Sequence, residues 1–365
     1  MEQQIITPKR TVIPFGPQHP VLPEPLHFDL VLEDEKIVDA IPTIGYIHRG
    51  LEMLVEKREF TEMVFVAERI CGICSFIHGL GYSQAVEEIM NIEVPKRAQY
   101  LRVIWSELSR IHSHLLWLGL AADAFGFENL FCQSWRARET VLDIIEETAG
   151  GRVIFGSCKV GGVRRDIDKD TMKRVLGVLD KLEKDARSIC NVFLKDNSVK
   201  HRLCGVGYLS TEDAKRLGAV GPMLRASGVK YDIRTTGYSV YDDLSFEIPV
   251  EKDGDCYARC AVRVAEIFQS FSLIRQAAEK MPEGELSVKV TGMPNGESFQ
   301  RLEQPRGEVI YYVKGNGTKF LSRFRVRTPT FANIPAMIQV LKGSDLADIP
   351  NIVLTIDPCI SCTER

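Results

Sequence analysis

Arg69-Ile70-Cys71-Gly72-Ile73-Cys74 and Asp357-Pro358-Cys359-Ile360-Ser361-Cys362 are the two stretches around which we expect the chain to fold. Each contains a Cys-x-x-Cys sequence, which presents two sulfurs within one turn, close enough to bind a single metal ion. The pairs stand near opposite ends of 365 residues. A four-sulfur site therefore forms only if the C-terminal stretch folds back against the first third of the chain, and the residues in between are its scaffold.

The overall composition is that of a globular protein and excludes some classes of function. Hydrophobic residues make up 45% and charged residues 26% of the chain, enough for a substantial core. A formal net charge of -3 gives no indication of a nucleic-acid partner. The segment Met1 to Gln4 is not apolar, and the most apolar run, 115–127, is short and contains Asp123. We therefore expect no signal peptide and no transmembrane helix, so that any membrane attachment is peripheral.

Ten cysteines without a secretory signal favour a reducing compartment. Six of them lie outside the two pairs: Cys132, Cys158, Cys190, Cys204, Cys256 and Cys260. We interpret these as small hydrophobic side chains. Cys256 and Cys260 are four residues apart on an expected helix, a spacing that suits a metal, but no second pair is evident nearby.

The hydrophobic periodicity predicts a mainly α, α+β chain, with a core of long helices and small β-hairpins at its edge. Helices are expected at residues 51–66, 77–90, 101–118, 139–148, 168–197, 211–217, 255–280 and 334–342. One hairpin is predicted over 27–40, and a second around Gly315-Asn316-Gly317. Residues 11–25, rich in proline and glycine, are expected to be irregular. Without a linker or repeat, we predict one domain, 1–365.

The cysteine pattern alone admits three kinds of site. A structural zinc site is the commonest, but its two pairs usually lie close together in sequence, whereas nearly the whole chain separates these. A redox dithiol would use one pair and leave the other idle. The third candidate is an all-thiolate site for a redox-active metal, because soft thiolates suit nickel and iron as well as zinc.

The flanking residues resemble the large subunit of [NiFe] hydrogenases, over essentially the whole chain. His78 follows the first cysteine pair, residues 48–52 are similar to the family's arginine-glycine-x-glutamate motif, and residues 303–308 to its proline-arginine-glycine motif. Within the family, the match is to the membrane-bound, energy-converting group (Ech-type and CO-induced hydrogenases). Four segments are also similar to the quinone-site subunit of respiratory complex I, a relative of that group: 16–20, 44–50, 114–119 and 327–332. That subunit lacks the four cysteines, which are intact here.

The resemblance implies a [NiFe]-hydrogenase large-subunit fold and the reaction H2 ⇌ 2 H+ + 2 e-. The expected direction is proton reduction with reduced ferredoxin, coupled to ion translocation by membrane partners. The implied cofactor is a nickel–iron centre with carbonyl and cyanide on iron, with magnesium usual at a third site. Implied partners are a small subunit with a [4Fe-4S] cluster, a ferredoxin-like subunit and membrane subunits, at the cytoplasmic face of the cell membrane. The alternative is a complex I-like quinone-site or structural subunit whose cysteines hold zinc.

By resemblance, Cys71 and Cys359 are terminal nickel ligands, while Cys74 and Cys362 bridge nickel and iron. Cys359 is also the expected thiolate base for the proton released from H2. Glu24 lies in the segment that matches the family's proton-relay glutamate. The alternative is that Glu24 is only a solvated carboxylate in a loop. In complex I relatives a quinone-binding histidine lies in this region, so Glu24 argues against quinone.

The resemblance also implies roles for residues around the cysteines. Arg306 is expected over the open side of the metals, with Asp357 as its salt-bridge partner. Pro329 and Thr330 match the element that holds the cyanide ligands. His78 is expected to donate to a bridging sulfur, or else to be a core histidine.

The C-terminus departs from the family. Arg365 stands three residues after the last cysteine, where standard large subunits have a histidine that helps hold the third metal. Glu52 matches another ligand of that metal, and we expect it either to bind a metal or to pair with Arg365. Tyr82 and Asp123 fall at quinone-site positions of complex I and are expected to be structural or part of a proton path. The positions left as packing or hydrogen-bonding residues are His19 and His48. Many family members also carry a C-terminal extension that is cleaved after nickel insertion.

Overall fold

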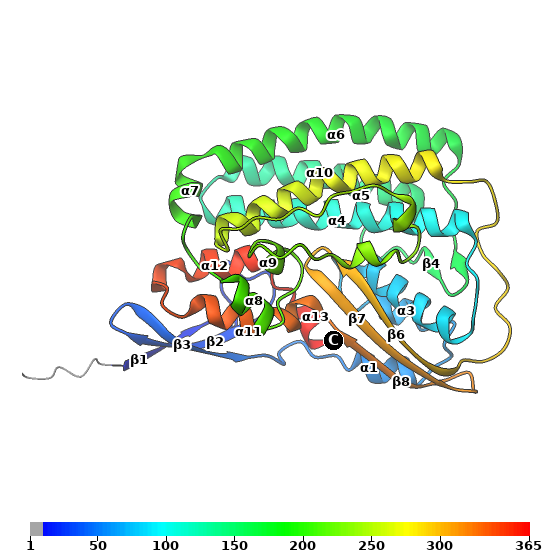
Figure 1. The fold of residues 1–365 in the computed structure, drawn as a ribbon, viewed down its shortest axis with the longest axis horizontal. Helices are drawn as coiled ribbons and strands as arrows, with labels where there is room; N and C mark the ends of the chain where they lie inside the picture. Colours follow the sequence, from blue (N-terminus) through cyan, green and yellow to red (C-terminus); the bar gives the residue numbers. More distant parts are fainter. Residues whose placement is uncertain (1–9) are drawn as a thin grey trace, which may run out of the picture.

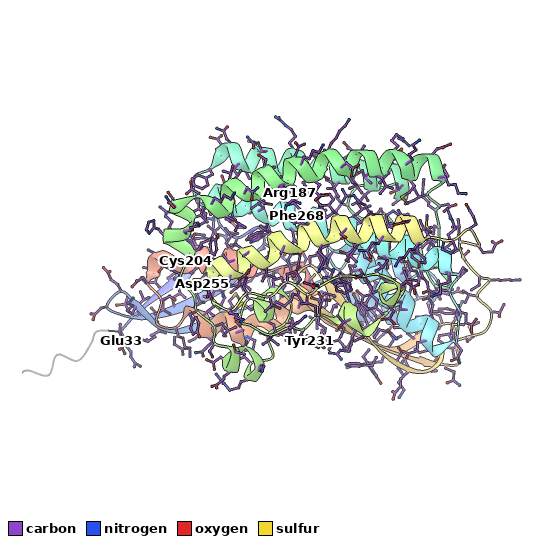
Figure 2. The ribbon with its side chains drawn as sticks, turned by 45° about the horizontal axis from the view of Figure 1, so that its top comes forward. Glu33, Arg187, Cys204, Tyr231, Asp255 and Phe268 are labelled. Carbon is purple, nitrogen blue, oxygen red and sulfur yellow. The ribbon has the colours of Figure 1, made fainter. Side chains whose placement is uncertain are left out.

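Four long helices lie side by side as the main layer of the molecule, which is a computed structural model describing residues 10–365 (Figure 1). They are α4 (Lys96–Ala124), α5 (Glu128–Ala149), α6 (Lys169–Lys195) and α10 (Cys256–Lys280). Aspartates begin two of them: Asp168 accepts a hydrogen bond from Thr171 N in α6, and Asp255 accepts one from Ala258 N in α10, as N-caps do. Figure 2 shows α6 facing α10 where the guanidinium of Arg187 lies 4.2 Å from the ring centre of Phe268.

Shorter helices occupy the layer beneath and the ends of the molecule. They are α1 (Leu51–Glu56), α2 (Val64–Glu68), α3 (Ser75–Ile89), α7 (Asn197–Leu203), α8 (Thr211–Arg216), α9 (Pro222–Arg225), α11 (Pro329–Leu341), α12 (Ile349–Ile356) and α13 (Ile360–Glu364). Three 3-10 turns, Ile233–Thr236, Tyr241–Asp243 and Leu346–Asp348, complete the helical part. The helices α2 and α3 flank the first cysteine pair. The second pair follows α12, with Cys359 just before α13 and Cys362 within it.

Within residues 10–365, three small antiparallel sheets lie at the edges of the helical layer. Their strands are β1 (Arg10–Phe15), β2 (His27–Glu33) and β3 (Lys36–Thr43); β4 (Cys158–Lys159) and β5 (Gly162–Val163); β6 (Asn295–Gln304), β7 (Gly307–Asn316) and β8 (Leu321–Arg327). The third sheet packs against α3. At that contact a Cβ on Gly81 would lie 2.1 Å from Cε2 of Tyr311, so only glycine lets the strand approach the helix this closely.

The C-terminal segment folds back into the middle of the molecule, where the C-terminus lies beside α13 and β7 (Figure 1). The indole of Trp117 in α4 donates to the carbonyl of Leu354 in α12 at 3.0 Å. Arg263 in α10 donates to the carbonyls of Thr355 and Ile356 at 2.6 and 2.9 Å, which satisfies groups that a helix end leaves open. These contacts hold the second cysteine pair against the first.

Buried ion pairs between α4, α9, α10 and β6 fix the turn that joins β6 to β7. Arg225 pairs with Glu266 at 2.6 Å and with Glu303 at 2.8 Å. Arg110 donates to the carbonyls of Glu303 and Gln304 at 2.9 and 3.2 Å. Burial raises the pKa of Glu303 to about 7. Because buried charges are costly unless paired, this network holds the turn that carries Gln304 and Arg306 in one position.

The predicted mainly helical α+β class and the hairpin over 27–40 are confirmed. The prediction that 11–25 is wholly irregular is wrong, because β1 pairs with β2; proline is tolerated there since β1 is an edge strand. The helix predicted over 51–66 is broken between α1 and α2, where Phe60 N bonds to Lys319 O.

Two predictions concern a signal peptide and a transmembrane helix. The segment Met1 to Gln4, on which the absence of a signal peptide was predicted, lies outside the described residues. Among the helices that the structure describes, none combines the length and apolar character needed to cross a bilayer. The prediction of one domain over the whole chain stays a prediction.

Candidate metal centre

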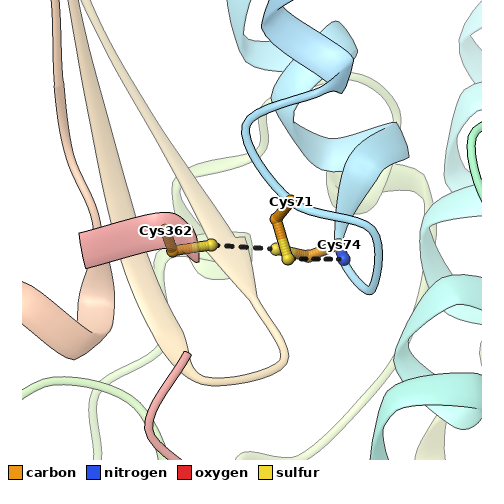
Figure 3. Close-up of side chains that lie close together, drawn as sticks. All are labelled: Cys71, Cys74 and Cys362. Carbon is orange, nitrogen blue, oxygen red and sulfur yellow. Dashed lines mark hydrogen bonds between the residues drawn. The ribbon is translucent and has the colours of Figure 1, made fainter. Parts of the chain in front are cut away.

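The sulfurs of the two Cys-x-x-Cys pairs converge in the interior. The Sγ atoms of Cys71 and Cys359 are 3.4 Å apart, as are those of Cys74 and Cys362. Cys71, Cys74 and Cys362 offer sulfurs within 4.8 Å of one another (Figure 3). All four thiols are buried and none forms a disulfide. Over residues 10–365, no other three His, Cys, Asp or Glu side chains converge in this way.

The electrostatics of this cluster fit a bound cation. Hydrogen bonds from the thiols of Cys359, Cys362 and Cys74 hold the pKa of Cys71 well below its usual range. Burial and the neighbouring thiols raise the pKa of Cys362 well above its usual range. The protein alone thus favours one thiolate and resists more, because buried like charges repel. A metal ion would remove that repulsion, so the donor set fits a soft metal.

The local backbone conformation orients the sulfurs of each cysteine pair. The amides of Ile73 and Cys74 point at the sulfur of Cys71 at 3.2 and 3.5 Å. Asp357 ends α12 with φ of 60°, a left-handed conformation that aspartate tolerates better than most residues, and Pro358 follows it. The Oγ1 of Thr330 accepts a hydrogen bond from the amide of Cys359 at 3.1 Å. The predicted residue Thr330 therefore contacts the second pair directly, at the start of α11.

Arg49 ties the two cysteine loops together. Its guanidinium donates to the carbonyls of Arg69 and Ile70 at 2.8 Å each and to the carbonyl of Ser361 at 3.2 Å. The motif around Arg49 was noted in the sequence, but this clamp was not predicted. Only the folded chain shows which carbonyls face the guanidinium.

His78 contacts the cluster through its imidazole. Its Nε2 lies 3.3 Å from the sulfur of Cys362, and its Nδ1 lies 2.6 Å from the hydroxyl of Tyr311. Burial lowers the pKa of His78 to about 4, so the ring is neutral at pH 7. The structure thus places His78 against a sulfur, whereas Tyr311 was not predicted.

Arg306 lies at the cluster with the expected partner. Its Nε donates to the carbonyl of Asp357 at 2.8 Å and its Nη2 to the Oδ1 of Asp357 at 2.8 Å. Its Nη1 donates to the hydroxyl of Ser113 at 3.3 Å. The guanidinium is buried, and burial raises the pKa of Asp357 although Arg306 and Arg263 oppose that. The site therefore contains a fixed positive charge beside the sulfurs.

Glu24 is bonded to the second cysteine pair and is not a free loop carboxylate. Its Oε2 accepts hydrogen bonds from the amides of Ile360 and Ser361 at 2.5 and 2.9 Å. The hydroxyl of Ser361 donates to its Oε1. A surface pocket lined by segment 17–25 opens beside it. Glu24 is half-buried and so stands between the cysteine loop and solvent.

Glu52 has the arginine partner that was the alternative to a metal. Its Oε1 lies 2.9 Å from Nε of Arg365, and its Oε2 lies 3.2 Å from Nη1 of Arg325. The amide of Val326 also donates to Oε1 at 2.9 Å. Two guanidinium groups on one carboxylate oppose the approach of a cation, which favours the ion-pair role.

For the remaining residues singled out in the sequence, the described part of the structure shows contacts with other parts of the chain and no hydrogen bond to a cysteine sulfur. Tyr82 is buried and donates to the carbonyl of Phe60 at 2.7 Å. Asp123 is exposed near the end of α4. His48 bonds to the carbonyl of Glu364 at 2.5 Å, and His19 packs on a phenylalanine ring. Pro329 is buried at the start of α11, next to Thr330.

Comparison with known proteins matches the chain to two family models. The model described as "Respiratory-chain NADH dehydrogenase, 49 Kd subunit" matches residues 125–293 and 287–365. The model described as "Nickel-dependent hydrogenase" matches residues 49–121, the part that holds the first cysteine pair.

Individual relatives cover nearly the whole chain. The chain is 40% identical to the membrane-bound hydrogenase subunit alpha of Pyrococcus furiosus, over 97% of this chain and 87% of the relative. It is 41% identical to the carbon monoxide-induced hydrogenase of Rhodospirillum rubrum, over 97% and 99%. A solved chain of the membrane-bound sulfane sulfur reductase, an archaeal respiratory membrane complex, superimposes with a TM-score of 0.93 at 31% identity, covering 100% of both chains.

Proposed function

Because the chain belongs to the family that joins the large subunits of membrane-bound [NiFe] hydrogenases with the 49 kDa subunit of respiratory NADH dehydrogenase, we propose that it is the catalytic subunit of an energy-converting hydrogenase. The observation that carries the proposal is the convergence of four buried cysteine sulfurs, with Arg306 and Asp357 beside them. A quinone-site subunit has no need of such a cluster.

The four cysteines would hold the nickel–iron centre. Cys71 and Cys359 would bind nickel alone, and Cys74 and Cys362 would bridge nickel to iron. This division is supported by the way in which the sulfurs face each other in two pairs at 3.4 Å. When bound, the centre supplies the heterolytic cleavage and formation of H2. Glu52, which bonds to Arg325 and Arg365, would serve as an ion-pair residue and not as a magnesium ligand.

The side chains around the sulfurs have separate tasks. Arg306 presents a permanent positive charge and planar N–H donors in a site from which water is excluded, where such charges act strongly. Asp357 and Ser113 hold that guanidinium in place. Pro329 and Thr330 would line the space for the cyanide ligands of iron, and the hydroxyl of Thr330 has a proton to donate besides the hydrogen bond that it accepts from Cys359.

A proton would leave the site through Cys359 and Glu24. Glu24 contacts the two residues that follow Cys359, and the hydroxyl of Ser361 bonds to its carboxylate. The pocket lined by segment 17–25 gives solvent access on its other side. A carboxylate so placed can accept a proton from the interior and release it to water.

Electrons would come from partner subunits. Within residues 10–365, the only cysteine cluster is the site itself, so no further thiolate set is present there for an iron–sulfur cluster. We propose a small subunit with a [4Fe-4S] cluster, a ferredoxin-like subunit and ion-translocating membrane subunits, with the complex at the cytoplasmic face of the membrane. Hydrogen evolution from reduced ferredoxin by the purified complex, absent with other electron donors, would support this arrangement.

An infrared spectrum of the complex purified without oxygen tests the proposed function. Protein itself has essentially no absorption where metal-bound carbonyl and cyanide stretch, so we expect bands there together with bound nickel. A sample with stoichiometric zinc, no nickel and no such bands would instead identify the chain as a complex I-like subunit with a structural four-cysteine zinc site.

Glu24→Gln is expected to slow hydrogen turnover by roughly 10²-fold or more, because an amide keeps the hydrogen-bonding shape but cannot carry a proton. The infrared bands should remain, since Glu24 touches the backbone and Ser361 but no sulfur. Turnover and spectra of the same preparations check this. Glu24→Asp serves as the control and should retain part of the rate; a glutamine variant with wild-type turnover would contradict the relay.

A further inference from the structure

We propose that Tyr311 is a positioning residue of the metal centre: its hydroxyl fixes the tautomer of His78 in which Nε2–H donates to the sulfur of Cys362. The proposal rests on the proposed function, because it concerns the electron density of a sulfur that would bridge nickel and iron. It adds to the site a residue from the third sheet, 233 positions from His78 in sequence.

The geometry places Tyr311 at the end of a short buried chain of atoms. Its hydroxyl lies 2.6 Å from Nδ1 of His78, and Nε2 of the same ring lies 3.3 Å from Sγ of Cys362. All three side chains are fully buried. The ring of Tyr311 lies where a Cβ on Gly81 would stand, so the close contact of β7 with α3 holds the hydroxyl against His78.

The state of the phenol decides the direction of its hydrogen bond. Burial raises the pKa of Tyr311 well above its usual value, so the hydroxyl keeps its proton. Its one hydrogen-bond partner in the described chain is Nδ1 of His78. A buried donor needs an acceptor, and a neutral imidazole accepts at only one of its two nitrogens. If Nδ1 accepts from Tyr311, the ring proton is on Nε2, facing Cys362.

The side chain of Gln304 discriminates between the two tautomers. Its amide nitrogen lies 3.2 Å from Nε2 of His78, and its Oε1 has no partner. With the proton of His78 on Nδ1, the amide of Gln304 would donate to Nε2, but the proton of Tyr311 and the Oε1 of Gln304 would both stay unsatisfied. If the ring proton of His78 is on Nε2, a 180° rotation of the Gln304 amide brings Oε1 to the place of the amide nitrogen. Oε1 and the sulfur of Cys362 can then both accept a hydrogen bond from Nε2–H. The second arrangement gives a partner to both the proton of Tyr311 and the Oε1 of Gln304, and amide orientation is assigned from the hydrogen-bond network.

A hydrogen bond to a metal-bound thiolate withdraws electron density from the sulfur. Hydrogen bonds to ligating sulfurs are among the means by which proteins set the reduction potential of metal centres. Tyr311 would therefore act on the metals through His78 and Cys362, without touching substrate. Its loss should change the spectrum and the potential of the centre before it changes binding of H2.

Infrared spectra and redox titration of the loaded complex test the proposal. In Tyr311→Phe the ring stays but Nδ1 loses its donor, so the proton of His78 redistributes and the sulfur becomes richer in electrons. The carbonyl and cyanide bands are expected to move to lower wavenumber, and the midpoint potential of the nickel signal to become more negative. Tyr82→Phe is the control: it also removes a buried hydroxyl, but one that bonds to the carbonyl of Phe60, and it should leave the bands in place.

A second variant covers the case in which Tyr311→Phe does not assemble. Replacing Tyr311 with 3-fluorotyrosine keeps the ring and makes the hydroxyl a stronger donor, so the bands should move to higher wavenumber. Bands that are present and are unmoved by every variant that loads the metals would overturn the role of Tyr311 alone. Bands missing from the wild-type complex would overturn the proposed function instead.

Discussion

Hydrogen evolution is expected to fall to background when Cys71, Cys74, Cys359 or Cys362 is replaced by serine. Each sulfur lies within 3.4 Å of another in the buried cluster, so each contributes one of four ligands. A serine hydroxyl is a harder ligand that stays protonated at neutral pH, and soft metals bind it far less well than a thiolate. Removal of one thiolate also leaves the positive charge of the bound metals less fully compensated in a buried site.

The measurement combines hydrogen evolution, nickel content and the infrared bands for each variant. Cys190→Ser is a matched control, because Cys190 is equally buried but lies on α6, away from the cluster. Its burial raises the pKa of the thiol to about 12, so it is an inert packing residue. Hydrogen evolution that persists in all four site variants would refute the hydrogenase function.

The position of this cluster was predictable from the sequence because its chemistry is local. The spacing fixes two sulfurs in each Cys-x-x-Cys turn, and a four-sulfur site requires the two ends of the chain to meet, as they do in the structure. The long helices were predictable for a similar reason, since an apolar stripe such as that of 101–118 repeats every three to four residues. The Cys-x-x-Cys spacing and the apolar periodicity are both patterns among residues that are close together in the sequence.

Contacts that depend on tertiary packing left no such signal. Tyr311 looks like any strand residue until β7 packs on Gly81 and brings its hydroxyl to His78. Arg49 lies near neither cysteine pair in sequence, yet it bonds to both loops. Periodicity also assigns charged residues to the surface, whereas Arg225 is buried because Glu266 and Glu303 from other elements pair with it.

Arg306→Lys is expected to lower turnover by roughly 10²–10³-fold, although the positive charge is kept. The guanidinium makes three separate hydrogen bonds, to the carbonyl and carboxylate of Asp357 and to the hydroxyl of Ser113. A lysine ammonium is a point charge on a flexible stem and cannot reproduce this planar arrangement. Its charge would therefore stand at another distance from the sulfurs, where the stabilisation of developing charge is weaker.

The outcome distinguishes two roles of Arg306: a charge whose exact position matters for turnover, and a residue that is needed only to build the site. The infrared bands of Arg306→Lys should remain, since no ligand changes, while kcat falls more than the affinity for H2. Arg301→Lys is the control, because Arg301 lies on β6, the strand that leads into the turn of Arg306, has an exposed side chain and pairs with Glu308. If Arg306→Lys kept its turnover within about twofold of wild type, the planar geometry of the guanidinium would not be required, which would contradict the prediction. If it lost the bands together with activity, Arg306 would be needed to build the site, because Asp357 stands two residues before Cys359 and would lose the partner that holds it.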